Sequence, residues 1–119
     1  MSSFTRTIPS NRGEDSVKQI LHRKNYFIPL AYRPIRAQVG DFIYLVFRGK
    51  IVGRAKISLI EVVNPEVSLT TSQYPAWAKC VVRYTGKWEE PPREIPVQGH
   101  QSVRYLETHS LTHLDSEVW

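Results

Sequence analysis

The sequence predicts a small α+β domain made mostly of strands: a pseudo-β-barrel of about five to six strands with one or two flanking helices. Short apolar stretches recur along most of the chain and are separated by turn residues. Helical periodicity is confined to one segment near the N-terminus. The chain has 119 residues, 41% of them hydrophobic, so we expect one domain over residues 1–119, with 108–119 as a C-terminal tail.

The N-terminal part of the chain predicts one strand and one helix. Phe4–Pro9 is a short strand candidate that ends at the proline. The acidic and hydroxyl side chains of residues 14–16 suit the start of a helix, because they favour the positive end of the helix dipole. Apolar residues 17, 20 and 21 then fall on one helical face, and the pattern stops at Asn25. We expect this short helix to pack its single apolar stripe against a sheet.

The clearest strand pair follows Tyr26–Ala37, which we expect to be an ordered loop with extended pieces because two prolines interrupt it. Phe42–Phe47 is apolar at every position, which predicts a strand covered on both faces. Residues 48–50 reverse the chain, and Ile51–Ile60 then alternates. The expected inner face is Ile51, Gly53, Ala55, Ile57 and Leu59, and the expected outer face is Val52, Arg54, Lys56 and Ser58. Small residues at 53 and 55 indicate a tight barrel wall or a close approach of the backbone.

The C-terminal half predicts two more strands. Asn64–Tyr74 is a polar connector, and Ala76–Tyr84 is the next strand candidate. Glu89–Pro96 contains three prolines and is expected to be a loop or an edge. After a turn at residues 98–101, Val103–Leu106 is the last strand candidate.

The charge of the chain favours a polyanionic partner. The formal net charge is +5, and the basic surplus lies before the tail, because no Lys or Arg follows Arg104. Such a surplus is typical of proteins that bind nucleic acid, here RNA or modified DNA, although many basic proteins bind none.

Other classes of protein are less well supported. Cys80 is the one cysteine, so no disulfide forms within the chain, and we interpret it as a core residue. No secretory signal and no apolar run long enough to cross a bilayer is visible, so we expect a cytoplasmic protein without a membrane partner. Phosphate-loop, serine-hydrolase and zinc motifs are absent, so we expect no cofactor and no metal.

Two pieces of the chain form a pattern. Gly40-Asp41 precedes the apolar strand, and the hairpin then leads into Ile51–Ala55. A closing piece, Pro96–Leu106, carries Gln98-Gly99 before an apolar strand, with Ser102 where a glycine is usual. Together these pieces resemble the PUA-like superfamily, which includes the ASCH and EVE domains, over about residues 14–107.

The resemblance implies a pseudo-barrel with a cleft bordered by one or two helices. Members of the superfamily bind RNA or are thought to read modified bases in DNA or RNA, and a few are hydrolases. The Lys-Thr-x-Glu-x-Arg stretch of many ASCH domains is absent upstream of Gly40, so no catalytic residue is carried over.

Basic residues around the central hairpin are the candidate nucleic-acid contacts. Fixed positive charge suits phosphate, and an arginine adds a planar fork for two oxygens. Amide and guanidinium groups on the closing segment can also read base edges. The candidate residues are Arg33, Arg36, Arg48, Lys50, Arg54, Arg104 and Gln101. The alternative is a solvated outer face.

Aromatic residues are the candidate base-stacking groups, since unstacked bases are held on aromatic faces. The wider set is Tyr26, Tyr32, Tyr44, Trp77, Trp88 and Tyr105. We predict a pocket formed by Tyr44, Trp88 and Tyr105, with Trp88 exposed in a polar loop. The alternative is that the rings in strands, Tyr44 and Tyr105, belong to the core.

Two other functions stay open. A small hydrolase or ribonuclease would need an acid–base pair, for which His100 with Glu89, Glu90 or Lys87 is the best available set. A protein-interaction module could instead dock through the tail. The tail histidines, His109 and His113, lack a second pair of ligands, so a metal site is not favoured.

Overall fold

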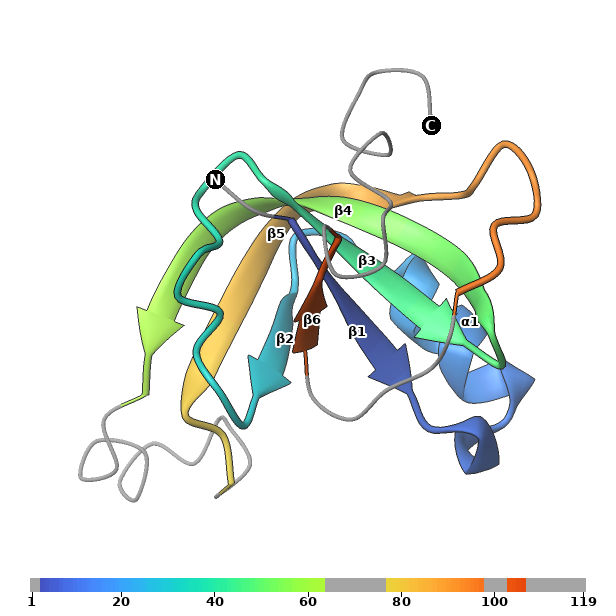
Figure 1. The fold of residues 1–119 in the computed structure, drawn as a ribbon, viewed down its shortest axis with the longest axis horizontal. Helices are drawn as coiled ribbons and strands as arrows, with labels where there is room; N and C mark the ends of the chain where they lie inside the picture. The colour runs from blue at the N-terminus through green and yellow to red at the C-terminus, as the bar shows by residue number, and fades with distance from the viewer. Residues whose placement is uncertain (1–2, 64–76, 98–102, 107–119) are drawn as a thin grey trace.

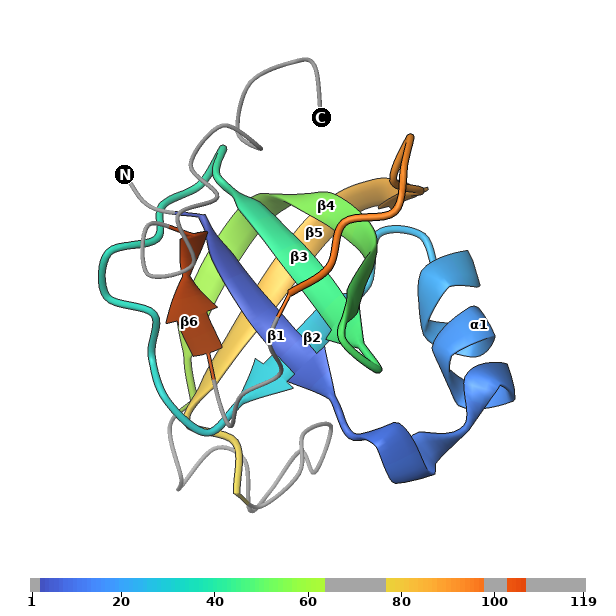
Figure 2. The same cartoon turned by 45° about the vertical axis from the view of Figure 1, so that its right-hand side comes forward.

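The computed structural model describes residues 3–63, 77–97 and 103–106, which form a curled sheet with a helix beside it (Figure 1). The elements in chain order are β1 (Phe4–Ile8), the 3-10 turn η1 (Ser10–Arg12), α1 (Glu14–His22), β2 (Phe27–Leu30), β3 (Phe42–Phe47), β4 (Lys50–Val62), β5 (Cys80–Glu89) and β6 (Val103–Tyr105). The six strands lie in the order β2-β5-β4-β3-β1-β6. β2 and β6 are the two edges of the sheet. The sheet between them curls into a half-barrel (Figure 2). This confirms the predicted mostly-β pseudo-barrel.

The first strand lies inside the sheet, next to the edge strand β6, although it begins the chain. β1 pairs with β3 in parallel and with β6 antiparallel, so the N-terminal segment lies between the middle and the end of the chain. Phe4 stands opposite both Ile43 and Tyr105. The buried hydroxyl of Thr5 donates a hydrogen bond of 3.0 Å to the Arg104 carbonyl, which satisfies a polar group inside the sheet.

Apolar residues pack on both faces of the sheet. The larger core lies on the inner face, where Val17, Ile20 and Leu21 of α1 cover strand residues such as Leu45 and Val82. The predicted helix and its apolar stripe are therefore confirmed. A smaller core on the outer face contains Tyr44, Val46, Ile51, Ile95, Val97 and Leu106. The segment after β5 crosses β3 there (Figure 2) and holds the hairpin through a 2.8 Å hydrogen bond from Val97 N–H to the Gly49 carbonyl.

The predicted alternation of β4 is wrong at Ile51, Val52 and Leu59 because bulges interrupt it. Val52, expected on the outer face, packs against the inner core. A register shift between Leu45 and Val46 places Ile51 opposite Val46 on the outer face, whereas Gly53 stays opposite Leu45 on the inner face. A further shift lies between Ile57 and Leu59, and Leu59 is 46% exposed instead of buried.

The strand predicted at Ala76–Tyr84 is shifted along the chain. β5 starts at Cys80 and continues to Glu89, so Trp88 lies in a strand and not in a loop. Gly86 makes the extension possible: it has a φ of 76° and meets Asn25, whose N–H donates to its carbonyl at 3.0 Å.

The other sequence expectations have mixed outcomes. The strands at Phe4–Ile8, Phe42–Phe47 and residues 103–105 are confirmed, and Tyr26–Ala37 contains one extended piece, β2, as expected. The connector at 64–74, the turn at 98–101 and the tail lie outside the described residues. Among the residues that are described, no helix is long and apolar enough to cross a bilayer.

Candidate nucleic-acid interface

Three of the basic residues predicted to bind phosphate have acidic partners. Arg48 lies 3.6 Å from Glu14, and Lys50 lies 3.0 Å from Glu94. These two pairs are exposed, so a polyanion could compete for their cations.

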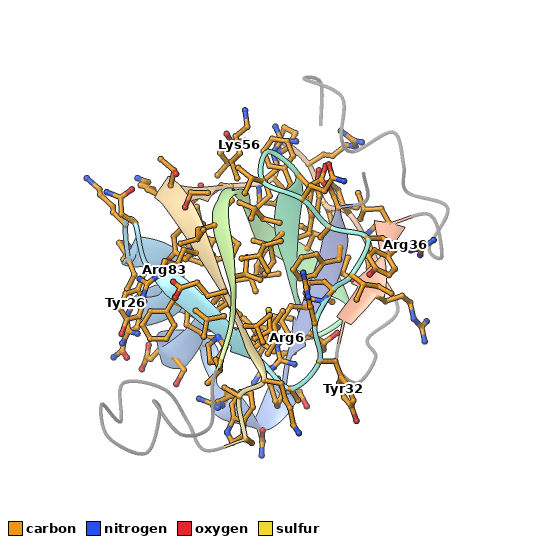
Figure 3. All side chains as sticks on the ribbon, turned by 90° about the vertical axis from the view of Figure 1, so that its left-hand side faces the viewer. Arg6, Tyr26, Tyr32, Arg36, Lys56 and Arg83 are labelled. Atoms are coloured by element: carbon orange, nitrogen blue, oxygen red, sulfur yellow. The ribbon has the colours of Figure 1, made fainter. Side chains whose placement is uncertain are left out.

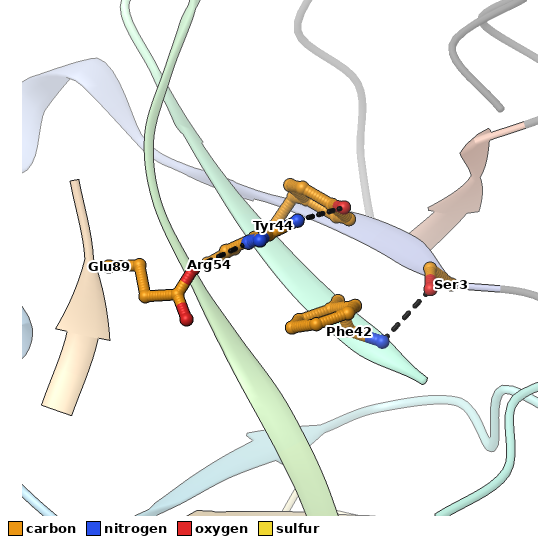
Figure 4. A network of polar contacts seen from close by, with 5 residues as sticks. All are labelled: Ser3, Phe42, Tyr44, Arg54 and Glu89. Carbon is orange, nitrogen blue, oxygen red and sulfur yellow. Dashed lines mark hydrogen bonds and ion pairs between the residues drawn. The ribbon is translucent and has the colours of Figure 1, made fainter. Parts of the chain in front are cut away.

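The third predicted cation, Arg54, is covered by its neighbours and only 6% exposed (Figure 4). Its Nε lies 2.8 Å from Glu89 Oε2, and its Nη1 donates a 3.4 Å hydrogen bond to Tyr44 Oη. The guanidinium also lies 4.3 Å from the centre of the Phe42 ring. Arg54 therefore ties β3, β4 and β5 together and is not presented to a ligand.

The predicted aromatic pocket is not assembled. Tyr44 is fully buried in the outer core, whereas Trp88 is 2% exposed and belongs to the inner core. The prediction that Trp88 is exposed is wrong, because the ring packs at 4.8 Å against Tyr84 inside the half-barrel. Neither Tyr44 nor Trp88 offers a free face to a base.

Arg36 and Tyr105 are the predicted residues that the structure does bring together. The Arg36 guanidinium lies 3.9 Å from the centre of the Tyr105 ring, and the Arg36 backbone N–H donates to Tyr105 Oη at 2.9 Å. Arg33 is exposed on the same loop, and Arg104 is half-buried on β6. Gln101 lies outside the described residues.

A different set of basic residues surrounds a cleft that opens into the half-barrel between β1 and β2. The cleft has a volume of about 410 Å³. Its walls come from β1 and η1, from one side of α1, and from the start of β2. Its charged lining consists of Arg6, Arg12 and Arg23, and no aspartate or glutamate is among the described residues that line it. Hereafter we call this the arginine cleft.

Arg6 is the central cation of the arginine cleft. It lies on β1 between Phe4 and Ile8, both of which face the inner core, so the strand period turns its side chain inward. Burial, together with the nearby charge of Arg12, lowers the pKa of Arg6 below the usual value of an arginine. Within the described part of the chain, no carboxylate pairs with the Arg6 guanidinium. Figure 3 shows Arg6 in the opening of the half-barrel, between Tyr26 and Tyr32 in that view.

Aromatic rings form the rest of the lining. The Arg23 guanidinium lies 4.7 Å from the centre of the Tyr26 ring, which stacks on Phe27 at 4.5 Å. Trp77 is 50% exposed at the cleft. Tyr84 forms part of the wall, and its hydroxyl donates to the Arg23 carbonyl at 2.8 Å. The cleft thus combines positive charge with aromatic rings. The sequence predicts the same combination, but at other residues.

Tyr26 and Trp77 belong to the wider aromatic set expected from the sequence, whereas Arg6, Arg12 and Arg23 are not among the predicted contacts. The available signal was Arg6, a charged residue at an inward position of a short apolar strand. A charge at such a position is costly unless it has a function or a partner.

The other candidate chemistries find less support in the described residues. No group of three or more possible metal ligands is present among them. Of the predicted acid–base set, Glu89 is engaged by Arg54, and His100 lies outside the described residues. A second hollow of about 360 Å³ lies between α1 and the β3–β4 hairpin, but Glu14 in its wall already pairs with Arg48.

Comparison with known proteins agrees with the architecture. No family model matches the chain, and no curated protein is significantly similar to it in sequence. Two crystal structures of mutant forms of ZmASCH from Zymomonas mobilis have a similar fold. One is 15% identical, with a TM-score of 0.57 over 96% of this chain and 96% of that chain. The other is 16% identical, with a TM-score of 0.54 over 96% and 99%. The chain therefore shares the overall fold of these ZmASCH structures.

Proposed function

We propose that this protein binds single-stranded or modified nucleic acid, with the arginine cleft as its main contact. The observation that carries the proposal is Arg6, a largely buried cation in a cleft whose described lining contains no acid. Desolvating a charge costs free energy unless an opposite charge compensates it. A phosphate group supplies that charge, and a guanidinium can bind two of its oxygens.

The aromatic part of the lining supports a nucleic acid over a simple anion. Trp77 is exposed enough to stack against a base, and such a stack contributes about 1–3 kcal/mol. Arg33 and Arg36 lie exposed on the loop after β2 and could extend the contact along the backbone of a strand. The resemblance to PUA-like domains is consistent with this function.

The test is fluorescence anisotropy with short labelled single strands of RNA and DNA, with and without modified bases, at several salt concentrations. We expect affinity to fall with salt, with a slope of about 0.7 per phosphate neutralised. Replacing Arg6 by Met removes a charge-assisted contact and should weaken binding about tenfold.

Arg93→Met is the matched control, because Arg93 is exposed on the segment after β5 and does not line the cleft. It makes the same chemical change and should leave affinity within about twofold, since the cleft loses none of its lining residues. Absence of binding to every strand at low salt would overturn the proposal. Equal losses for Arg6→Met and Arg93→Met would show that binding does not use the cleft.

A further inference from the structure

We propose that the arginine cleft recognises the terminal phosphate of a strand, a phosphomonoester, in preference to the phosphodiesters within it. This inference rests on the proposed function and names the group that the cleft selects. The shared chemistry is a nucleotide with a dianionic phosphate, which a strand end or a free mononucleotide can present.

The charge in the cleft is the first argument. Arg6 and Arg12 line the same cleft, and the described residues of the lining supply no carboxylate to pair with either guanidinium. A phosphodiester carries one negative charge, whereas a phosphomonoester carries about −1.5 to −2 at neutral pH. Two adjacent guanidinium groups are therefore neutralised by one monoester but only half-neutralised by one diester.

The size of the cleft is the second argument. About 410 Å³ lies near the lower end of the range for small-ligand sites, which is roughly 300–1,000 Å³. Such a volume suits one nucleotide unit and not a continuous strand. The nucleotide at the end of a nucleic-acid strand can enter such a cleft most easily.

The distribution of polar and aromatic groups is the third argument. Ser16 and Gln19 line the cleft along with the arginines and can donate hydrogen bonds to a sugar or to phosphate oxygens. Trp77 supplies an exposed ring for the base. One nucleotide can use all three kinds of group at once, whereas a bare phosphate would leave the ring unused.

The experiment compares internally labelled single strands of one sequence that carry a 5′-phosphate, a 3′-phosphate or hydroxyls at both ends. We expect either the 5′-phosphorylated or the 3′-phosphorylated strand to bind about tenfold more tightly than the strand with hydroxyls at both ends, at neutral pH. The preference should shrink as the pH falls below about 6, where the monoester takes up a proton. A nucleoside monophosphate and its nucleoside, compared by titration calorimetry, form the second arm.

Arg12→Ala is the decisive variant, because Arg12 is exposed and its loss should not disturb folding. It should abolish the preference for the phosphorylated end, whereas Arg93→Ala should retain it. Equal affinity for phosphorylated and hydroxyl strands would overturn this inference and leave the proposed function standing. Binding of the mononucleotide without binding of any strand would support the phosphate site and overturn the proposed function. Absence of binding in both arms would overturn both.

Discussion

The Nε atom of Arg54 lies 2.8 Å from a carboxylate oxygen of Glu89, and the two side chains differ greatly in exposure, at 7% and 55%. The carboxylate therefore retains part of its hydration while it compensates a guanidinium that is almost fully covered. Such a pair compensates a charge that the packing of β3, β4 and β5 has buried. This pairing also explains why Arg54, although it lies among basic residues of β4, is not available to a ligand.

We expect Glu89→Gln to lower the free energy of unfolding by about 1–2 kcal/mol, because it leaves the Arg54 guanidinium buried without its carboxylate. Urea unfolding followed by circular dichroism measures the change. Glu94→Gln is the control, since it removes the acid of an exposed pair with Lys50 and should cost less than about 0.5 kcal/mol. Equal effects of the two substitutions would contradict the structural role assigned to Arg54.

Periodicity predicted where the strands lie but not which face every side chain takes. Phe42–Phe47 and Lys50–Val62 pair as the apolar pattern indicates. Alternation cannot reveal a bulge, because one extra residue reverses the face of all that follow. For this reason Ile51 was assigned to the wrong face, and Leu59 was expected to be buried.

Gly53 was correctly interpreted as a point of close approach. A Cβ atom there would lie 2.8 Å from Leu21 Cδ2 and 3.4 Å from the Glu89 carbonyl oxygen. We expect Gly53→Ala to cost about 1 kcal/mol of unfolding free energy, because the end of the Leu21 side chain must shift within the packed interface between α1 and the sheet. In a Leu21→Ala background the clash disappears, so the same substitution should cost much less. Additive effects in this double-mutant cycle would show that the helix does not limit residue 53.

The residues expected at the candidate site are not those that line the arginine cleft. Positive charge and aromatic rings do meet in one hollow, but the arginines come from β1, η1 and the end of α1. The predicted hairpin cations are paired with carboxylates from segments far away in the sequence, such as Glu14 and Glu94. Composition reports how many cations a chain has, whereas only the fold decides which of them lack an acid.

Tyr105 should hold the loop between β2 and β3 in place. Its hydroxyl accepts a hydrogen bond from the Arg36 backbone N–H, and its ring lies under the Arg36 guanidinium. We expect Tyr105→Phe to retain the ring contact, to lose the hydrogen bond, and to cost about 0.5–1.5 kcal/mol. Trypsin should then cleave faster after Arg33 and Arg36, as limited proteolysis with mass spectrometry can show. An unchanged cleavage rate at both sites would count against this anchor.

Stability should fall in alkaline solution because of two buried groups. Burial raises the pKa of Cys80 above its usual 9.0 and that of Tyr84 above its usual 10.0. The unfolded chain therefore releases these protons first, so stability is unchanged below about pH 9 and falls as the pH rises further. Urea unfolding between pH 7 and 11 should show this slope, and Cys80→Ala with Tyr84→Phe should flatten it. A slope that the double variant retains in full would assign the effect to other groups.

The arginine cleft should lower the free energy of unfolding of the protein without a ligand, and a bound anion should raise it again. Arg6 is largely buried, lies near Arg12, and has no carboxylate partner among the described residues, so its charge opposes folding. We expect Arg6→Met to raise the free energy of unfolding by about 1 kcal/mol, since a thioether fills the same space without a charge. Arg23→Met should instead be neutral or destabilising, because it removes the contact of a guanidinium with the Tyr26 ring.

Inorganic phosphate should raise the melting temperature of the unmodified protein more than that of Arg6→Met, because only the former retains the full binding charge. A less stable Arg6→Met variant would mean that the guanidinium is compensated within the fold, and the cleft would then lose its reason to bind an anion.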